Sequence, residues 1–364
     1  MARAAAVLHG VTPLLANRLR WSGPDSWRRF AADQFHHVRA RQQRVETLLC
    51  QLHHVSAAER VGFIALKGSA LHDLKLYLPG QRPMADIDLL VHPRDAVAMT
   101  RALQSLGYRE TTVTWKHGVF TVDGPASRPE ALPFGEYRDA AIKIELHTAI
   151  AEQLPVRCHD INRFVLSDAM PPGCNAYPSM FALLLHLLLH AAGNMVGHVL
   201  RLIQLYDIAL LASRMSAADW EMVAAAPAWA LPPLQLTQRY FPESIPAGVL
   251  TALRRRCPAS LNRLALTRRL SDLSYARLWI QPFPGLEWSA SPGETIECIW
   301  RRIRPNGAQL SNLGMARKEP WAQNSDLQLS RPRRIVRHLL RWPPRPPTMY
   351  VVRAALAAAT SDGN

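Results

Sequence analysis

The sequence is constrained most by the stretch from Gly62 to Val91, where a short apolar run, a glycine turn, a helical segment and an acidic strand follow one another. The apolar run from Phe63 to Leu66 predicts one strand, and a second strand contains Asp86 and Asp88. Because successive side chains of a strand point to opposite faces, both carboxylates are expected on the same face. The stretch therefore predicts a sheet with one acidic face.

This acidic pair is chemically informative. Two carboxylates about one strand repeat apart repel each other and raise each other's pKa unless a cation neutralises them. Hard oxygen ligands at this spacing suit Mg²⁺, although a solvated acidic edge strand would show the same pattern. Since either substitution relieves the repulsion, we expect Asp86→Asn and Asp88→Asn to leave the fold intact or slightly more stable.

The turn Lys67-Gly68-Ser69 lies between the first strand and the helical segment. A Gly-Ser pair lets the backbone approach a phosphate, and a helix N-terminus adds amide donors there. Ser69 could also cap the helix. Such a turn is common by itself. Followed by Asp-x-Asp on a strand, it indicates a site that holds a nucleotide's phosphates beside a bridging metal.

At these residues the chain resembles the DNA polymerase beta-like nucleotidyltransferase superfamily, whose motif is a Gly-Ser turn followed by Asp-x-Asp. It is similar in particular to an uncharacterised nucleotidyltransferase family that is often found beside genes for modifying ribosomally made, lasso-type peptides. The residues that carry this closer resemblance are Leu66-Lys67-Gly68, Tyr77, Arg82 and Asp86-Ile87-Asp88-Leu89-Leu90-Val91. The resemblance covers roughly residues 40 to 215 and leaves the C-terminal third unexplained.

The resemblance implies a third carboxylate, because members of the family carry an acidic residue two positions before a histidine on a later strand. Glu145 and His147 match that pattern, with Glu in place of the commoner Asp. The implied catalytic and metal-binding set is Asp86, Asp88 and Glu145, which would hold two Mg²⁺ ions. The implied nucleotide-binding residues are Lys67, Gly68, Ser69 and Arg82, with ATP or another NTP as the donor. Arg82 could instead form a salt bridge with the aspartates.

By the same resemblance, the chain transfers a nucleoside monophosphate to a hydroxyl or phosphate acceptor. A ribosomally made peptide is the favoured acceptor, and an RNA such as tRNA or a small aminoglycoside-like molecule would use the same three carboxylates. A protein of another class, a catalytically inactive basic binding module, is the remaining alternative. The complete set of acidic residues argues against that alternative.

Composition limits the kinds of partner and of site that the chain can have. The 364 residues have a formal net charge of +15, which favours phosphate-bearing or acidic partners. The five cysteines lack any C-x-x-C spacing, so neither a zinc knuckle nor a disulfide framework is indicated. The apolar run from Phe181 to Ala192 is shorter than the about 20 residues of a membrane span. We expect a cytoplasmic protein without a membrane span.

The expected fold is α+β, with a polymerase beta-like sheet, N-terminal helices and a C-terminal helical region. The expected divisions are an N-terminal helical segment at 1–58, the nucleotidyltransferase core at 59–150, a helical region at 151–340 and a Pro/Arg-rich tail at 341–364. Strands are expected at 108–113 and 116–122, and helices at 26–58, 93–106, 178–192 and 195–214.

Several polar residues receive structural interpretations. His186 and His190 share a helix face at a spacing that could bind zinc, but core histidines are expected there. Asp207 is read as a structural partner on the next helix. Arg41 is expected on a solvated face of the first long helix. For a nucleic-acid acceptor, the C-terminal arginines would line a groove that leads to the acidic site.

Overall fold

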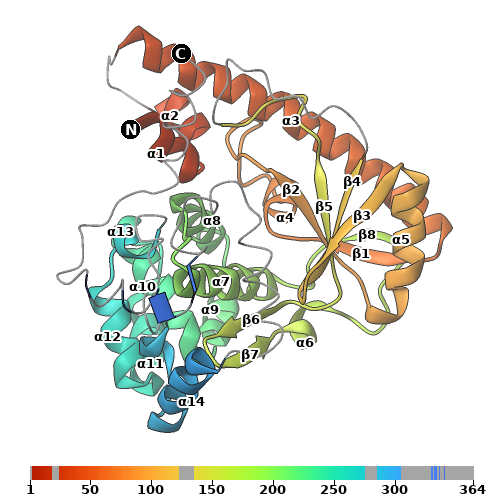
Figure 1. Ribbon diagram of the computed structural model, residues 1–364. Helices are drawn as coiled ribbons and strands as arrows, with labels where there is room; N and C mark the ends of the chain where they lie inside the picture. Colours follow the sequence, from red (N-terminus) through yellow and green to blue (C-terminus); the bar gives the residue numbers. More distant parts are fainter. Residues whose placement is uncertain are drawn as a thin grey trace.

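The computed structural model describes residues 2–18, 24–122, 135–274 and 285–304, together with positions 329, 330, 332, 333, 336 and 340. These residues form an α+β fold, as expected (Figure 1). The helices are α1 (Ala2–Leu8), α2 (Thr12–Arg18), α3 (Asp25–Ala58), α4 (Gly68–Asp73), α5 (Ala96–Ser105), α6 (Asn162–Val165), α7 (Met180–Gly197), α8 (Leu202–Ala212), α9 (Ala217–Ala224), α10 (Leu231–Tyr240), α11 (Ala247–Arg256), α12 (Ala259–Thr267), α13 (Leu270–Leu273) and α14 (Pro292–Ile303). The strands are β1 (Gly62–Ala65), β2 (Asp86–Leu90), β3 (Tyr108–Val113), β4 (His117–Val122), β5 (Lys143–His147), β6 (Ala151–Leu154), β7 (Arg157–Asp160) and β8 (Gly173–Asn175).

Six of these strands form one mixed sheet in the order β3-β4-β5-β2-β1-β8. β2 runs parallel to β5, whereas β4 pairs antiparallel with β3 and β5, and β1 pairs antiparallel with β2. The parallel register places Asp88 opposite Glu145 and Asp86 opposite Lys143. The expected strands at 108–113 and 116–122 are confirmed as β3 and β4. β8 adds to the sheet a strand that lies after residue 150, the expected end of the nucleotidyltransferase core. The expected domain boundaries stay a prediction.

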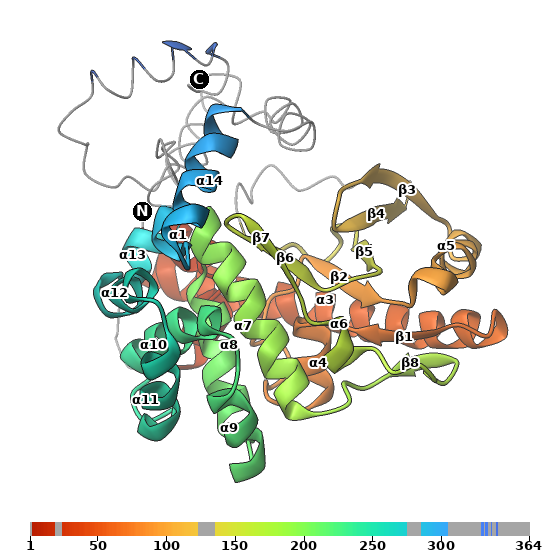
Figure 2. The same cartoon turned by 90° about the horizontal axis from the view of Figure 1, so that it is seen from below.

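The two faces of the sheet bury different cores. On one face, Ile87, Leu89 and Ile144 pack with apolar residues of α3 and α5. On the other face, Ile64 and Leu90 join the larger core built by α7 and the helices after it. Figures 1 and 2 show the sheet with α3 and α5 on one side and the helical region on the other. The acidic residues of β2 therefore lie on the face that looks toward the helical region.

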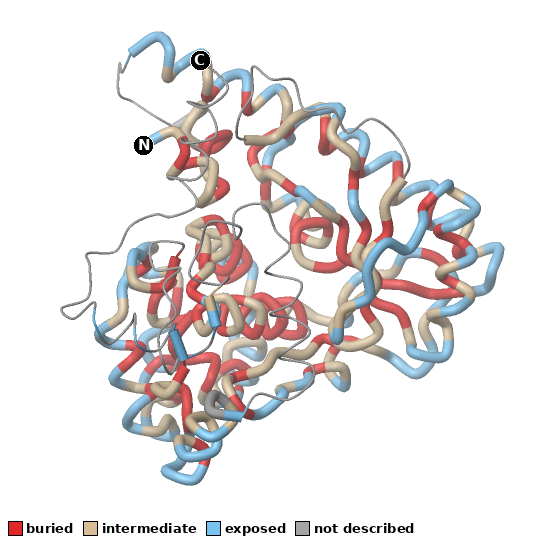
Figure 3. Tube along the Cα trace, viewed as in Figure 1, coloured by how far each residue is buried: buried red, intermediate tan, exposed pale blue. Residues whose placement is uncertain are grey.

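α7 is the central helix of that region. By length and composition it could cross a membrane, but 67% of its residues are buried inside the protein. Figure 3 shows most of this helix in the colour of buried residues. Burial of this kind is typical of a core helix. The hairpin of β6 and β7 precedes it, so the region expected to be helical begins with two short strands.

After α8 the described residues contain six further helices, α9 to α14, within the region expected to be helical. Several of their arginines have local partners. Arg256 donates to the carbonyl oxygens at the end of α9, and Arg301 contacts Glu297 and the Val156 carbonyl. The expected tail at 341–364 and most of the arginines after residue 304 lie outside the described residues. The groove expected for a nucleic-acid acceptor stays a prediction.

Arg41 of α3 corrects the expectation of a solvated face at this position. Its side chain is 4% exposed, and it donates to the carbonyl oxygens of Met84, Ala85, Ala140 and Ala141 at 2.7 to 3.1 Å. The first two precede β2 and the last two precede β5. A single buried guanidinium therefore holds together the starts of the two parallel strands.

We expect Arg41→Lys to lower the free energy of unfolding by roughly 2 to 4 kcal/mol, because one ammonium cannot reach carbonyls on both strands and buried acceptors lose their donor. Urea denaturation at neutral pH measures the loss. Arg29→Ala, on an exposed position of the same helix, is the matched control and should change stability by less than about 0.5 kcal/mol. Equal stability of Arg41→Lys and wild type would show that the hydrogen bonds of Arg41 to the starts of β2 and β5 do not stabilise the fold.

Candidate active site

The candidate site lies where β2, β5 and β4 run side by side. The register of β2 and β5 places Glu145 on the strand next to the one that carries Asp86 and Asp88. The alternation of side chains then puts these three carboxylates on one face of the sheet. His147 follows Glu145 on the same face, and β4 places His117 directly opposite His147. The catalytic roles of these residues stay predictions.

Asp88 is the most strongly held of the carboxylates. Its Oδ1 accepts a hydrogen bond from Lys67 Nζ at 2.7 Å and lies 3.1 Å from His147 Nε2. Burial alone would raise the pKa of Asp88, but the Lys67 charge and the His147 contact hold that pKa well below its usual value. Asp88 is therefore a buried anion with a permanent cationic partner.

Asp86 has the opposite environment. Burial, followed by repulsion from Asp88 and Glu145, raises the pKa of Asp86 to about 6, and the positive charges of Lys67 and Arg82 offset only part of this effect. The same face thus carries more negative charge than its side-chain cations neutralise. Carboxylate oxygens with uncompensated charge are the donor set that a divalent hard cation prefers, so the residues present fit a magnesium ion.

The turn before α4 brings Lys67 to Asp88. Lys67 has a φ of 48° and a ψ of −115°, a conformation that non-glycine residues rarely adopt. The side chain of Ser69 is buried and does not cap the helix, because the N-cap position is Lys67 and no side chain caps there. Ser69 occupies the second position of α4 instead. The backbone of the turn thus presents the Lys67 side chain, the Gly68 amide and the Ser69 side chain from adjacent positions.

Arg82 lies between α4 and β2, with its side chain against this turn, and pairs with the helical region. Its Nε and Nη2 donate to both oxygens of Asp207 at 2.8 and 2.7 Å, and the Tyr77 hydroxyl donates to Oδ1 of the same carboxylate at 2.6 Å. The third nitrogen, Nη1, lies against Gly68, where an added Cβ would collide with it and come within 2.8 Å of Met84 Sδ. A side chain at position 68 would therefore displace the Arg82 guanidinium from the turn. The salt-bridge partner of Arg82 is Asp207 rather than Asp86 or Asp88.

α7 covers the site from the helical side. His186 Nδ1 lies 2.7 Å from the Tyr177 hydroxyl, and burial drives the pKa of His186 well below its usual value, so its ring is neutral. His190 contacts Asn194 and lies 3.9 Å from Glu152. His186 is buried, as expected of a core histidine, whereas His190 is partly exposed.

Sequence reasoning did not single out Tyr177, Glu152 or His117. Tyr177 and Glu152 carry no motif that marks them. His117 could have been noticed only by pairing its strand with that of His147, and single-sequence patterns do not give strand pairing.

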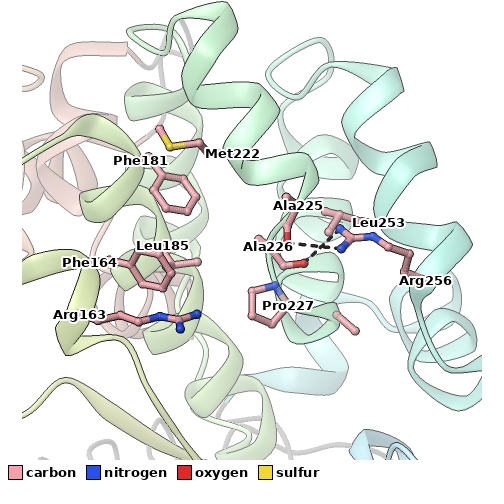
Figure 4. Close-up of a pocket in the computed structure, with 11 residues that line it drawn as sticks. Arg163, Phe164, Phe181, Leu185, Met222, Ala225, Ala226, Pro227, Leu253 and Arg256 are labelled. Atoms are coloured by element: carbon pink, nitrogen blue, oxygen red, sulfur yellow. Dashed lines mark hydrogen bonds between the residues drawn. The ribbon is translucent and has the colours of Figure 1, made fainter.

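Two cavities differ in their relation to this site. The first, of about 710 Å³, is lined by Ser69, Tyr177 and residues of α3, α4 and α7. The second, of about 420 Å³, lies between α6, α7, α9 and α11, and Arg163 and Arg256 lie on opposite sides of it (Figure 4). None of the three carboxylates lines either cavity. Only the first cavity reaches the turn that carries Lys67.

Comparison with known proteins gives one match. A family model described as an uncharacterised nucleotidyltransferase matches residues 2–229, which is more than half of the chain. No curated protein and no solved structure matches.

We expect the two aspartates to respond oppositely to substitution in metal-free protein at pH 7.5. Because the pKa of Asp86 is raised to about 6, its ionisation costs stability above that pH. Asp86→Asn should therefore raise the free energy of unfolding by about 1 to 3 kcal/mol, and the gain should shrink as the pH falls toward 4. Asp88→Asn removes the anionic partner of buried Lys67 and should destabilise by roughly 3 to 5 kcal/mol.

Urea denaturation in the presence of a chelator measures both effects. This result would correct the expectation, drawn from repulsion alone, that both substitutions are neutral or stabilising. Equal responses of Asp86→Asn and Asp88→Asn would contradict the assigned charge distribution.

Proposed function

The chain belongs to the uncharacterised nucleotidyltransferase family, and from this premise we propose that it moves a nucleoside monophosphate from an NTP to an acceptor in a Mg²⁺-dependent reaction. The protein is an enzyme, a transferase of nucleotidyl groups. The observation that carries the finer proposal is the register of β2 and β5. That register sets Asp88 beside Glu145, two residues from Asp86, with surplus negative charge on the face.

In this proposal the three carboxylates hold the metal. When bound there, Mg²⁺ supplies charge neutralisation for the triphosphate and lowers the pKa of the acceptor hydroxyl. Asp86, with its raised pKa, gives up its proton before it can ligate. Asp88 stays ionised because Lys67 and His147 stabilise its charge. Glu145 contributes the third carboxylate on the adjacent strand, and a two-ion site is the form that the family resemblance implies.

The triphosphate is assigned to the turn after β1. The Gly68 amide and the Ser69 hydroxyl are its proposed hydrogen-bond donors, and Lys67 is the proposed source of positive charge beside it. Arg82 acts here through Nη1, since its other two nitrogens donate to Asp207. These groups orient the donor nucleotide against the carboxylates. The polymerase beta-like assignment of the sheet belongs to the same proposal.

We propose a ribosomally made peptide as the acceptor, in a cytoplasmic setting. The cavity of about 710 Å³ beside Ser69 supports this choice. Its lining contains one lysine and no arginine, whereas Glu46 and Asp73 add negative charge and Leu49 and Leu183 add apolar surface. A phosphate backbone would need cationic partners there. An RNA acceptor remains the second candidate, because the overall charge of +15 favours polyanions.

The acceptor is tested by incubating the purified chain with α-labelled NTPs and Mg²⁺, together with separated peptide, RNA and small-molecule fractions of a cell extract. Label in the peptide fraction supports the proposal, and label confined to RNA overturns the peptide acceptor. Absence of transfer with intact NTP binding would favour the binding-module alternative.

We expect Glu145→Gln to reduce Mg²⁺-supported transfer by at least about a hundredfold, because a metal ligand contributes several kcal/mol of charge stabilisation and about 1.4 kcal/mol corresponds to tenfold. Pyrophosphate release measured at saturating NTP gives the rate. Glu221→Gln removes an exposed carboxylate on α9 and serves as the control with unchanged rate. Near wild-type turnover of Glu145→Gln would exclude this carboxylate from the reaction.

A further inference from the structure

We infer that His117, Glu145 and His147 form a binding site for a first-row transition-metal ion, beside the oxygen site of Asp86 and Asp88. The inference deepens the proposed function and rests on it for the role of the ion, because Glu145 is the proposed third carboxylate. The donor set and its geometry, however, are independent of that function.

The donor atoms already converge. Nε2 of His117 lies 3.5 Å from Glu145 Oε2, and Nε2 of His147 lies 3.6 Å from the same oxygen. One donor atom from each residue lies within 4.8 Å of the others. Donors about 2.1 Å from a tetrahedral ion stand about 3.4 Å apart, so two of the three spacings match closely. A small rotation of one imidazole ring would bring the third spacing, between the two histidine nitrogens, close to the same value.

The backbone fixes this arrangement. His117 opens β4 directly opposite His147 of β5, and Glu145 lies two residues before His147 on the same face. The two rings are 4.7 Å apart between centroids. Side chains that project from paired strands are held more precisely than side chains on loops, which is a requirement for a metal site.

Ordinary structural contacts do not explain the position of His117. A separation of 3.5 Å from Glu145 is too long for a strong hydrogen bond. Its Nδ1 is buried and has no hydrogen-bond partner among the described residues. An imidazole directed at a carboxylate and at a second imidazole is a ready ligand.

The chemistry of the donors selects the class of ion. Imidazole nitrogens favour zinc, iron, cobalt and nickel over magnesium, which requires oxygen donors in near-octahedral geometry. Two nitrogens with one carboxylate oxygen therefore suit a transition-metal ion at Glu145. Asp88 Oδ1 lies 3.1 Å from His147 Nε2, so the two sites adjoin each other. Asp86 and Asp88 remain the oxygen donors for Mg²⁺, and Glu145 is shared between the two ions.

The test uses the full chain after treatment with a chelator. Co²⁺ titration should produce visible absorption bands of a nitrogen- and oxygen-ligated ion. Zn²⁺ should remove those bands, and Mg²⁺ in excess should not. Calorimetry with Zn²⁺ gives the affinity. His117→Ala should weaken Zn²⁺ binding by more than about tenfold. Even residues that only hydrogen-bond to a metal ligand change metal affinity by about 10- to 100-fold.

His36→Ala, an exposed histidine of α3, is the control and should bind Zn²⁺ like wild type. If His117→Ala fails to fold, His117→Gln replaces it, and X-ray absorption of the Zn²⁺-loaded wild type needs no variant. That spectrum should contain scattering from two imidazoles, and its absence overturns the site. Zn²⁺ binding no tighter than Mg²⁺ binding, or unchanged in folded His117→Ala, also overturns it.

The outcomes separate this inference from the proposed function. Mg²⁺-dependent transfer without Zn²⁺ or Co²⁺ binding overturns the transition-metal site alone. Co²⁺ binding through His117 in a chain that transfers no nucleotide overturns the proposed function alone.

Discussion

The contact of Arg41 with the starts of β2 and β5 is the constraint on which the candidate site depends. These strands are parallel, so no hairpin turn sets their register, and a slip of one residue would turn Glu145 to the other face. One guanidinium bonds carbonyl oxygens that precede both strands, with Glu136 at 3.5 Å as a further partner. Helix α3 therefore aligns the carboxylates although it contributes none of them.

A second buried arginine connects the sheet to the helices. Arg82 binds Asp207 of α8 and rests on Gly68 of the turn. Buried ion pairs contribute little net stability but are costly to break at one end. We interpret the Arg82–Asp207 pair as a device that fixes the turn relative to the helical region. The position of Lys67 beside Asp88 then depends on residues more than a hundred positions away in the sequence.

The sequence allowed the local parts of this site to be predicted. Strand alternation alone placed Asp86 and Asp88 on one face, and the order of strand, turn and helix located Lys67 to Ser69. The position of Glu145 required a family resemblance, because strand pairing between residues 86 and 145 is a long-range property.

The buried state of Arg41 and the approach of His117 to Glu145 could not be predicted for the same reason. Arg41 looks like any arginine on the polar face of a helix. Its partners are backbone carbonyls 43 and 99 residues away, and backbone groups leave no trace in the side-chain pattern. His117 carries no signal until β4 is paired with β5.

Position 67 has two conflicting requirements, one from its backbone conformation and one from its side chain. A residue with a positive φ and this ψ stores strain of about 1 to 3 kcal/mol unless it is glycine. Glycine there, however, would leave Asp88 without its ammonium partner. Because a buried Asp88 without its cationic partner would cost about 3 to 5 kcal/mol, relief of the strain would not offset the loss of the ammonium. The strained backbone at position 67 is therefore the more stable arrangement for this chain, and a variant chosen there for a relaxed backbone would be less thermally robust as well as less active.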